Sequence, residues 1–271
     1  MARRRSSLRL SCLVFPCLIL VLVAPSASAA DLAELIEEYR EAARGSAAPQ
    51  RGRGGGRGGR PGFGRDGGGN DAVARVLDEI SKLGTDESLA FLVGELRQSR
   101  NPPHIAAACA GPVVRHANPR APSLALEDFG SRHPDVQRAI LDAVAAAKRD
   151  VSAASKDLLL AARASNLRPE VAERLPAALA RLDSIDGARA TLGAVPSEKG
   201  RGSGDAVSGY KKAAIEALSS TKSDSLKHWI ANDGIQTASR SPAALEICLA
   251  VVEKLRLTDA RDSVLKALAH R

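Results

Sequence analysis

Three side chains of the kinds that bind zinc lie near one another in the first half of the sequence. They are His104, Cys109 and His116. Their spacings of five and seven residues match no zinc signature, and the sequence contains neither a CxxC nor an HExxH motif. We therefore predict no metal site and no cofactor in this chain.

Cys109 and Cys248 are the only cysteines that follow residue 29, and they leave two alternatives, a disulfide or two free thiols. The helical pattern described below places them four helical units apart. Neighbouring helices pack about 8–10 Å apart, whereas a disulfide needs Cα atoms within about 7 Å of each other. This separation favours free thiols, and Cys248 falls on the apolar row of its predicted helix.

The sequence lacks the motifs that assemble common active sites. No serine stands in a GxSxG motif, no GxxxxGK[ST] loop is present, and no GxGxxG follows a predicted strand. Adjacent carboxylates, such as Glu37 with Glu38, fall on the polar faces of predicted helices, where solvated charge is ordinary. We therefore predict that the protein is not an enzyme and has no catalytic residues.

The elements that would position these side chains are predicted to be helices. Of the 271 residues, 44% are hydrophobic but only 3% are aromatic. Sandwiches and barrels use aromatic and β-branched residues, whereas the segments rich in alanine and leucine suit closely packed helices. The length is enough to bury the core of one or two domains, and the composition excludes collagen and a wholly disordered chain. We expect an all-α protein.

Residues 1–29 have the layout of a secretory signal peptide. Four arginines precede an apolar run of about fifteen residues, and small residues lead to a cleavage site after Ala29. The alternative is an uncleaved membrane anchor, but the run is shorter than the roughly twenty residues that a spanning helix needs. Removal of this segment lowers the formal net charge from +8 to 8 − 4 = +4. We expect an exported protein that is periplasmic, in the cell envelope or secreted, with no transmembrane span after cleavage.

Residues 45–70 are predicted to form a disordered Gly/Arg-rich linker, because glycine gains nothing from burial and loses the most backbone freedom on folding. Five arginines and one aspartate give this segment a charge of 5 − 1 = +4. The composition resembles the RGG segments of RNA-binding proteins, in which arginine pairs with phosphate and stacks on bases. In an exported protein the ligand would be an anionic polymer or surface, and the alternative is a plain solvated linker. The candidate polyanion-binding residues are Arg51, Arg53, Arg57, Arg60 and Arg65.

A short amphipathic helix is predicted at residues 30–44, ahead of the linker. Its apolar face follows the i, i+3, i+4, i+7, i+11 spacing and consists of Leu32, Leu35, Ile36, Tyr39 and Ala43. Either this helix folds back onto one end of the main domain, or it presents its apolar face to a partner. We prefer the first alternative.

Residues 71–271 contain a pattern of paired helices that repeats. Segment 71–96 aligns with 242–268 through one inserted residue, and similar pairs lie at 134–162, 168–195 and 208–230. The equivalent buried position is separated by gaps of 64, 35, 39 and 34 residues, so the double gap leaves room for a sixth unit at 101–131. In that unit, Gly111-Pro112 is predicted to break a helix. The five equivalent residues are Ile80, Val144, Leu179, Leu218 and Val252.

A period in the thirties is typical of an α-solenoid, in which stacked helix pairs share one continuous core. The stretch from Asp135 to Val144, DVQRAILDAV, resembles the core helix of the HEAT-repeat family, which has an Asp-Val-Arg-like start followed by small and aliphatic residues. The resemblance covers 71–271, about three quarters of the chain. It implies an α-solenoid of about six HEAT-like helical hairpins and a scaffold that binds proteins without a catalytic site of its own.

The charges of the helical region disfavour nucleic acid as its ligand. The predicted second helices carry −2 at 86–99, +1 at 151–165 and zero in the other three units, which sums to −2 + 1 = −1. A solenoid that binds a polyanion is expected to carry a basic stripe instead. We therefore predict an exported, non-catalytic scaffold for a protein partner of unknown identity. The alternative is a polyanion or surface binder that acts through the linker arginines, which strong salt dependence would reveal.

Overall fold

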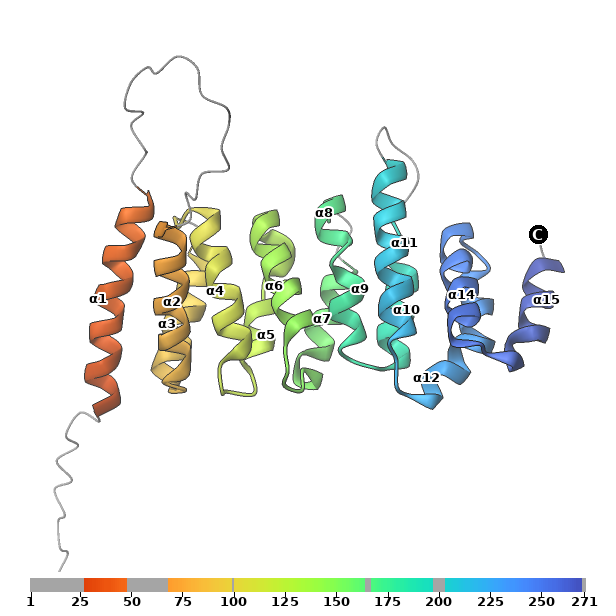
Figure 1. Ribbon diagram of the computed structural model, residues 1–271, viewed down its shortest axis with the longest axis horizontal. Helices are drawn as coiled ribbons and strands as arrows, with labels where there is room; N and C mark the ends of the chain where they lie inside the picture. The colour runs from red at the N-terminus through yellow and green to blue at the C-terminus, as the bar shows by residue number, and fades with distance from the viewer. Residues whose placement is uncertain (1–26, 48–67, 99, 164–166, 197–202, 270–271) are drawn as a thin grey trace, which may run out of the picture.

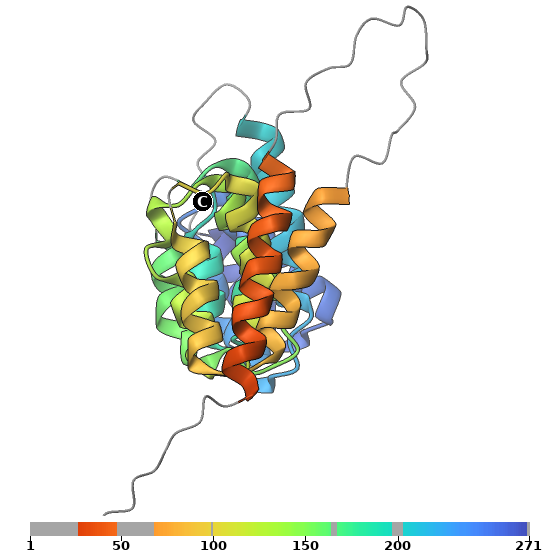
Figure 2. The same cartoon turned by 90° about the vertical axis from the view of Figure 1, so that its left-hand side faces the viewer.

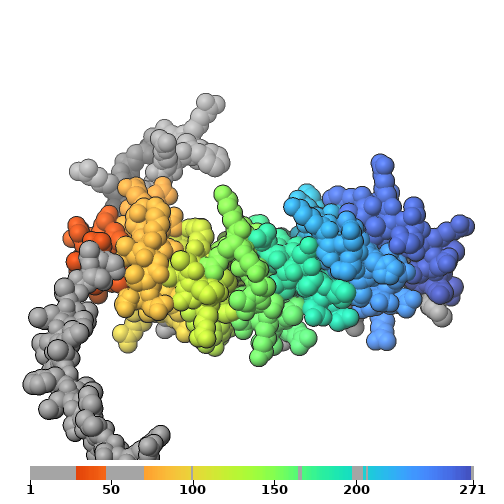
Figure 3. All heavy atoms as spheres, turned by 90° about the horizontal axis from the view of Figure 1, so that it is seen from below, coloured from red at the N-terminus to blue at the C-terminus, as the bar shows by residue number. Residues whose placement is uncertain are grey.

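The computed structural model describes residues 27–47, 68–98, 100–163, 167–196 and 203–269, which form helices and contain no strand. The expected all-α class is confirmed for these residues. Figure 1 shows the helices standing side by side in chain order, from α1 (Ala27–Ala47) at one end to α15 (Arg261–Ala269) at the other. The result is an elongated body in which the helices follow one another along the long axis in chain order, as Figure 3 also shows.

The helices that follow α1 form two layers, which Figure 2 shows end-on. The first layer contains α2 (Gly68–Lys82), α4 (Pro103–Arg115), α6 (Pro134–Ala146), the single turn α8 (Pro169–Ala172) with α9 (Leu175–Ala180), α11 (Ser203–Ser219) and α14 (Pro242–Leu255). The second contains α3 (Asp86–Arg97), α5 (Ala121–Leu126), α7 (Ser155–Ala162), α10 (Ile185–Gly193), α12 (Asp224–Trp229), α13 (Ile235–Ala238) and α15. A π-helical turn at Ile230–Gly234 joins α12 to α13, and 3-10 turns occupy Phe129–Ser131, Ser152–Ala154 and Thr258–Ala260. Within each layer a helix packs against the next along the chain, as α2 does on α4 and α3 on α5.

A similar turn hydrogen bond lies near the end of five first-layer helices. In each, the backbone N–H three residues after a buried aliphatic residue donates to the carbonyl of that residue. The pairs are Leu83 to Ile80, His116 to Val113, Ala147 to Val144, Leu182 to Leu179 and Thr221 to Leu218. Four of the five predicted positions are therefore buried within the last three residues of a first-layer helix, and so is Val113 in α4. The fifth, Val252, is half-buried in α14.

The prediction that Gly111-Pro112 breaks a helix was wrong, because α4 runs from Pro103 to Arg115 without interruption. Pro112 lacks an N–H for the preceding turn, but its own carbonyl accepts a hydrogen bond of 2.8 Å from the Ser81 hydroxyl of α2. Helix α4 also packs against α2 and α6 and fully buries Val113 and Val114. Burial of these side chains outweighs the single missing backbone hydrogen bond.

Helix α1 packs against α2 and closes the N-terminal end of the row, so it folds back as we preferred. Leu32 and Tyr39 are buried, and the Tyr39 ring meets the Phe91 ring edge to face with centroids 5.4 Å apart. This contact explains why a short segment ahead of a glycine-rich tract is held in place.

The predicted boundaries of the first segments need correction. Helix α1 begins at Ala27 rather than at residue 30 and continues to Ala47, and α2 begins at Gly68. The segments 45–47 and 68–70, which were predicted as the ends of the linker, are therefore helical. Alanine is the strongest helix former and favours the extension at the N-terminal end of α1, which places the predicted cleavage residue Ala29 in its first turn. Residues 1–26 and the arginine set Arg51, Arg53, Arg57, Arg60 and Arg65 lie outside the described residues.

Candidate functional site

An open groove crosses the first layer over α6, α9 and α11. Its volume is about 760 Å³, and it includes the turns that follow these three helices. Small side chains line each of the helices there: Ala145 in α6, Ala177 and Ala180 in α9, and Ala213 and Ala217 in α11. Because alanine is the smallest residue with an apolar side chain, this strip is recessed between the longer charged side chains around it.

The charges around the groove are mixed and balanced. Five basic residues, Lys148, Arg149, Arg174, Arg181 and Lys222, face five acidic residues, Asp142, Asp150, Glu173, Asp183 and Glu216, so the sum is 5 − 5 = 0. A surface that attracts a polyanion would carry an excess of positive charge. The groove instead suits a ligand that itself carries both signs of charge, as a polypeptide does.

Several of these charges hold the turns of the first layer to one another. The Arg149 guanidinium donates to the carbonyl of His116 in the preceding unit. Arg181 in turn donates to the carbonyl of Arg149 at 3.3 Å, and the hydroxyl of Thr221 donates to the Asp183 carboxylate. These contacts join four successive turns along one edge of the groove, so they serve the fold.

Four other charged side chains are available to a ligand. Within the described part of the chain, no hydrogen bond or ion pair engages the side chains of Lys148, Lys222, Glu173 or Glu216. The carboxylate of Glu173 lies against Gly209 in α11, where a Cβ atom would overlap it. Two cations and two carboxylates are thus arranged around the alanine strip.

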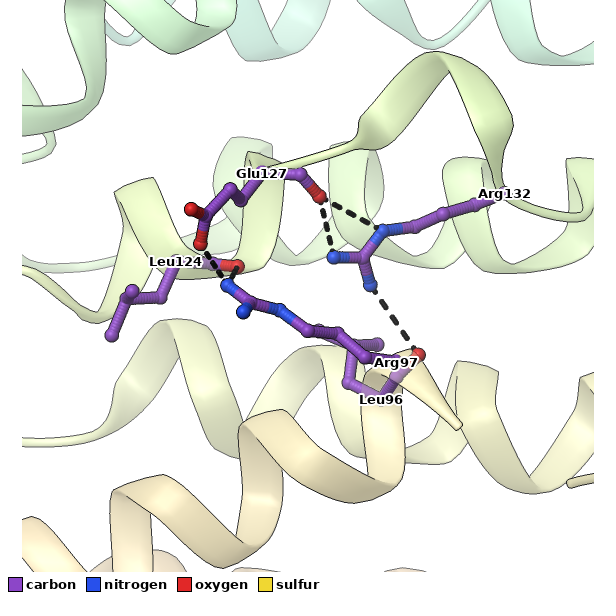
Figure 4. A network of polar contacts seen from close by, with 5 residues as sticks. All are labelled: Leu96, Arg97, Leu124, Glu127 and Arg132. Atoms are coloured by element: carbon purple, nitrogen blue, oxygen red, sulfur yellow. Dashed lines mark hydrogen bonds and ion pairs between the residues drawn. The ribbon is translucent and has the colours of Figure 1, made fainter. Parts of the chain in front are cut away.

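A second, smaller cleft of about 410 Å³ lies where α3 ends and α4 and α6 begin. Figure 4 shows the two arginines beside it. Arg132 donates to the carbonyl of Leu96 at 3.3 Å and twice to the carbonyl of Glu127, at 2.6 and 3.1 Å. Arg97 donates to the carbonyl of Leu124 and forms an ion pair with the Glu127 carboxylate.

These arginines satisfy backbone groups rather than a ligand. The last carbonyls of a helix have no hydrogen-bond donor within that helix. Arg132 donates to the carbonyl of Leu96 near the end of α3 and to the carbonyl of Glu127, which caps the end of α5. Burial, followed by the nearby positive charge of Arg97, lowers the pKa of Arg132. The network therefore braces two second-layer helices against each other, and we regard the groove as the better candidate site.

The side chains first considered as metal ligands are not brought together. His104 is exposed at the start of α4, whereas Cys109 is fully buried within it. The His116 ring is also buried: its Nδ1 accepts the N–H of Asn118 at 3.1 Å, and its Nε2 lies 3.0 Å from the Ser88 hydroxyl. Among the described residues, no group of three or more His, Cys, Asp or Glu side chains is placed to hold a metal ion.

Cys109 and Cys248 are free and buried, as the separation of their helices predicts. Burial raises the pKa of the Cys248 thiol to about 12 and that of Cys109 still further. Neither thiol is therefore ionised near neutral pH, and the reactive form of cysteine is absent from both positions.

Sequence reasoning missed the groove, although one signal for it is present. A basic residue followed two positions later by aspartate recurs after three first-layer helices, as Lys148 with Asp150, Arg181 with Asp183 and Lys222 with Asp224. The first two pairs and Lys222 line the groove. Recurrence of charge at equivalent turns would have indicated that these residues gather on one face.

No family model, curated protein or solved structure matches the chain. Among the helices of the described segments, none has the length and apolar character needed to cross a bilayer. The function must therefore be inferred from the arrangement of the helices and from the groove.

Proposed function

We propose that the protein is a non-catalytic scaffold of the HEAT-like α-solenoid type, exported from the cell, which binds a protein partner in the groove over α6, α9 and α11. The partner is expected to be a polypeptide segment that carries both acidic and basic side chains. It would lie across the three helices, against the alanine strip, and pair with Lys148, Lys222, Glu173 and Glu216.

The shared ends of the first-layer helices support the solenoid. The same turn hydrogen bond recurs at Ile80, Val113, Val144, Leu179 and Leu218, with separations of 33, 31, 35 and 39 residues. Units of this length that pack chiefly on their neighbours are the defining property of helical-repeat proteins. In the proposed solenoid, α14 and α15 would form the sixth hairpin.

The groove is the observation that carries the binding function. Helical-repeat proteins recruit ligands along extended surfaces made by equivalent helices of successive units. Here three successive helices contribute a recessed apolar strip with charged groups on both sides. The basic and acidic residues around the groove are equal in number, so the groove has no net positive charge to attract a polyanion.

A photo-crosslinking experiment tests this proposal. A photoreactive amino acid is placed at Ala177, which is exposed in the groove, and at Ala90, which is exposed on α3 in the second layer and serves as the matched control. We expect the variant with the photoreactive group at Ala177 to capture a defined protein in envelope extract and the one at Ala90 not to do so. Adding Lys148→Glu and Lys222→Glu should remove the crosslink while leaving the helical content unchanged.

The same experiment separates the scaffold from the polyanion binder. It is repeated at high salt and with the linker residues Arg51, Arg53, Arg57, Arg60 and Arg65 changed to serine. Capture at Ala177 that survives both changes supports the scaffold. Retention that requires low salt and the five arginines, with no crosslink specific to Ala177, would show that the linker binds an anionic polymer and would overturn the proposal.

A further inference from the structure

The two ends of the helical row differ in how their apolar surface is covered. At the N-terminal end, α1 covers α2 and turns an acidic face outwards, with Asp31, Glu34, Glu37, Glu38 and Glu41 all exposed. At the other end, Leu265 and Leu268 of α15 are 57% and 50% exposed. Two large apolar side chains exposed to this extent on one face of a helix form a surface that a partner can cover.

Helix α15 has a clearly divided surface. Its buried side chains, Ser263 and Ala267, lie on the side that faces α13 and the π-helical turn. At 100° per residue, Leu265 points away from that side. Leu268 lies next to Leu265 on the exposed face, about one turn further along the helix. Asp262 and Lys266, both exposed and four residues apart, border the same face along its other edge.

The charges indicate what covers this face. Residues 246–269, which form most of the C-terminal end, contain four basic and four acidic residues, so the net charge is 4 − 4 = 0. Two such ends do not repel each other. Helix α1 carries two basic and five acidic residues, a net charge of 2 − 5 = −3, so two N-terminal ends do repel.

We propose that the C-terminal end of one chain packs against the same end of a second copy, with the two α15 helices antiparallel across a two-fold axis. Leu265 lies next to the axis in this arrangement, and Leu265 and Leu268 of both chains bury one another. Asp262 of each chain comes within about 3 Å, measured along the helix axes, of Lys266 in the other, given the rise of about 1.5 Å per residue. Apolar contact and two symmetric ion pairs then use the same face on both copies, as an isologous interface requires.

Sedimentation equilibrium of the purified protein over a wide concentration range tests this interface. We expect a monomer–dimer equilibrium with no larger species. Leu265→Asp should raise the dimer dissociation constant by about a hundredfold or more, because each dimer loses two buried leucines and buries two carboxylates. Leu160→Asp is the matched control, since Leu160 is 53% exposed on α7 in the middle of the row, and it should leave the equilibrium unchanged.

Charge reversal tests the two-fold geometry without removing the leucines. Asp262→Lys puts the new lysine of each chain opposite Lys266 of the other chain, at two symmetric places. The repulsion should raise the dissociation constant by about tenfold. Adding Lys266→Asp to that variant restores opposite charges across the axis and should return the constant to its original value. The proposal would be overturned by a protein that stays monomeric at all concentrations or by a mass that grows beyond the dimer. It would also be overturned if the double variant had the same dissociation constant as Asp262→Lys.

Discussion

The hydroxyl of Tyr39 in α1 donates a hydrogen bond of 2.6 Å to the carboxylate of Glu95 in α3, across 56 residues of sequence. Asn101 donates to the same carboxylate oxygen at 2.8 Å. Helix α1 is therefore held to the row by a charged hydrogen bond as well as by burial of the Tyr39 ring against Phe91.

Tyr39→Phe keeps the ring and removes only the hydroxyl. Because hydrogen bonds to charged groups contribute about 1.5–3 kcal/mol, we expect the free energy of unfolding to fall by about this amount. Urea denaturation measures the change. Glu38→Gln, at an exposed neighbouring position of the same helix, should leave the stability nearly unchanged, and equal stabilities for both variants would show that the hydrogen bond contributes nothing.

The stability should fall in mild acid because of His116. Burial, assisted by the positive charge of Arg149, lowers the pKa of His116 below its usual value of 6.5. The unfolded chain then binds the proton more tightly than the folded chain, so the stability that the neutral ring provides is present above pH 6.5 and is lost as the pH falls below it. We expect urea unfolding at about pH 7.5 and about pH 5 to show this decrease.

Two histidine variants identify the group responsible for the pH dependence. His116→Gln removes the titrating ring and should flatten the dependence between these two pH values, whatever its effect on stability at neutral pH. His104→Gln changes an exposed ring in α4 and should leave the dependence as it is in the natural protein. The reverse pattern would assign the titration to a different residue.

Gly187 allows α10 to approach α9 closely. A Cβ atom at this position would lie 3.0 Å from the carbonyl oxygen of Leu179, which is backbone and cannot turn away. Gly187→Ala should therefore lower the free energy of unfolding by about 1–3 kcal/mol. Gly193, in the last turn of the same helix, has nothing within 4 Å of such an atom, so Gly193→Ala should raise stability by about 0.4–1 kcal/mol. Thermal or urea unfolding compares the two, and destabilisation by both would rule out the close approach as the cause.

Arg132 should not be replaceable by lysine. Its planar guanidinium reaches the carbonyls of Leu96 and Glu127 together, and a lysine ammonium lacks that fork. We expect Arg132→Lys to lower the free energy of unfolding by about 1–3 kcal/mol, as a carbonyl is left without a donor. Arg138→Lys, on the exposed face of α6, should change it by less than about 0.5 kcal/mol. Chemical denaturation measures both variants. Similar losses of unfolding free energy in the two would contradict the role of Arg132 in holding α3 and α5 together.

Much of the first layer was predictable because its apolar side chains recur at helical spacing. Ile80, Val144, Leu179 and Leu218 are buried as predicted, because a helix that packs on one side buries the apolar residues that recur on that side. The place of Val113 in a helix was not predicted, because the adjacent Pro112 favours a helix break. The packing of α4 between its neighbours overrides this local preference. Local propensity is thus a poor guide where packing is tightest.

The groove and the seat of α1 could not be predicted in the same way. The groove unites Asp142 with Lys222, 80 residues apart, and depends on how far successive helices are offset. The hydrogen bond from Tyr39 to Glu95 depends on which helices α1 packs against, and an amphipathic pattern does not specify them. Periodicity indicates which side of a helix is buried but not what lies against it.

The stacking of each helix pair on the one before it also bears on how the chain acquires its structure. Every pair from α4 onwards can bury its apolar side on residues that have already been synthesised, so folding can advance along the row from its N-terminal end. Contacts between elements close in sequence form quickly, because little loop entropy is lost in making them. The protein should consequently tolerate interruption of its synthesis late in the row better than loss of α2 or α4, on which the later pairs are built.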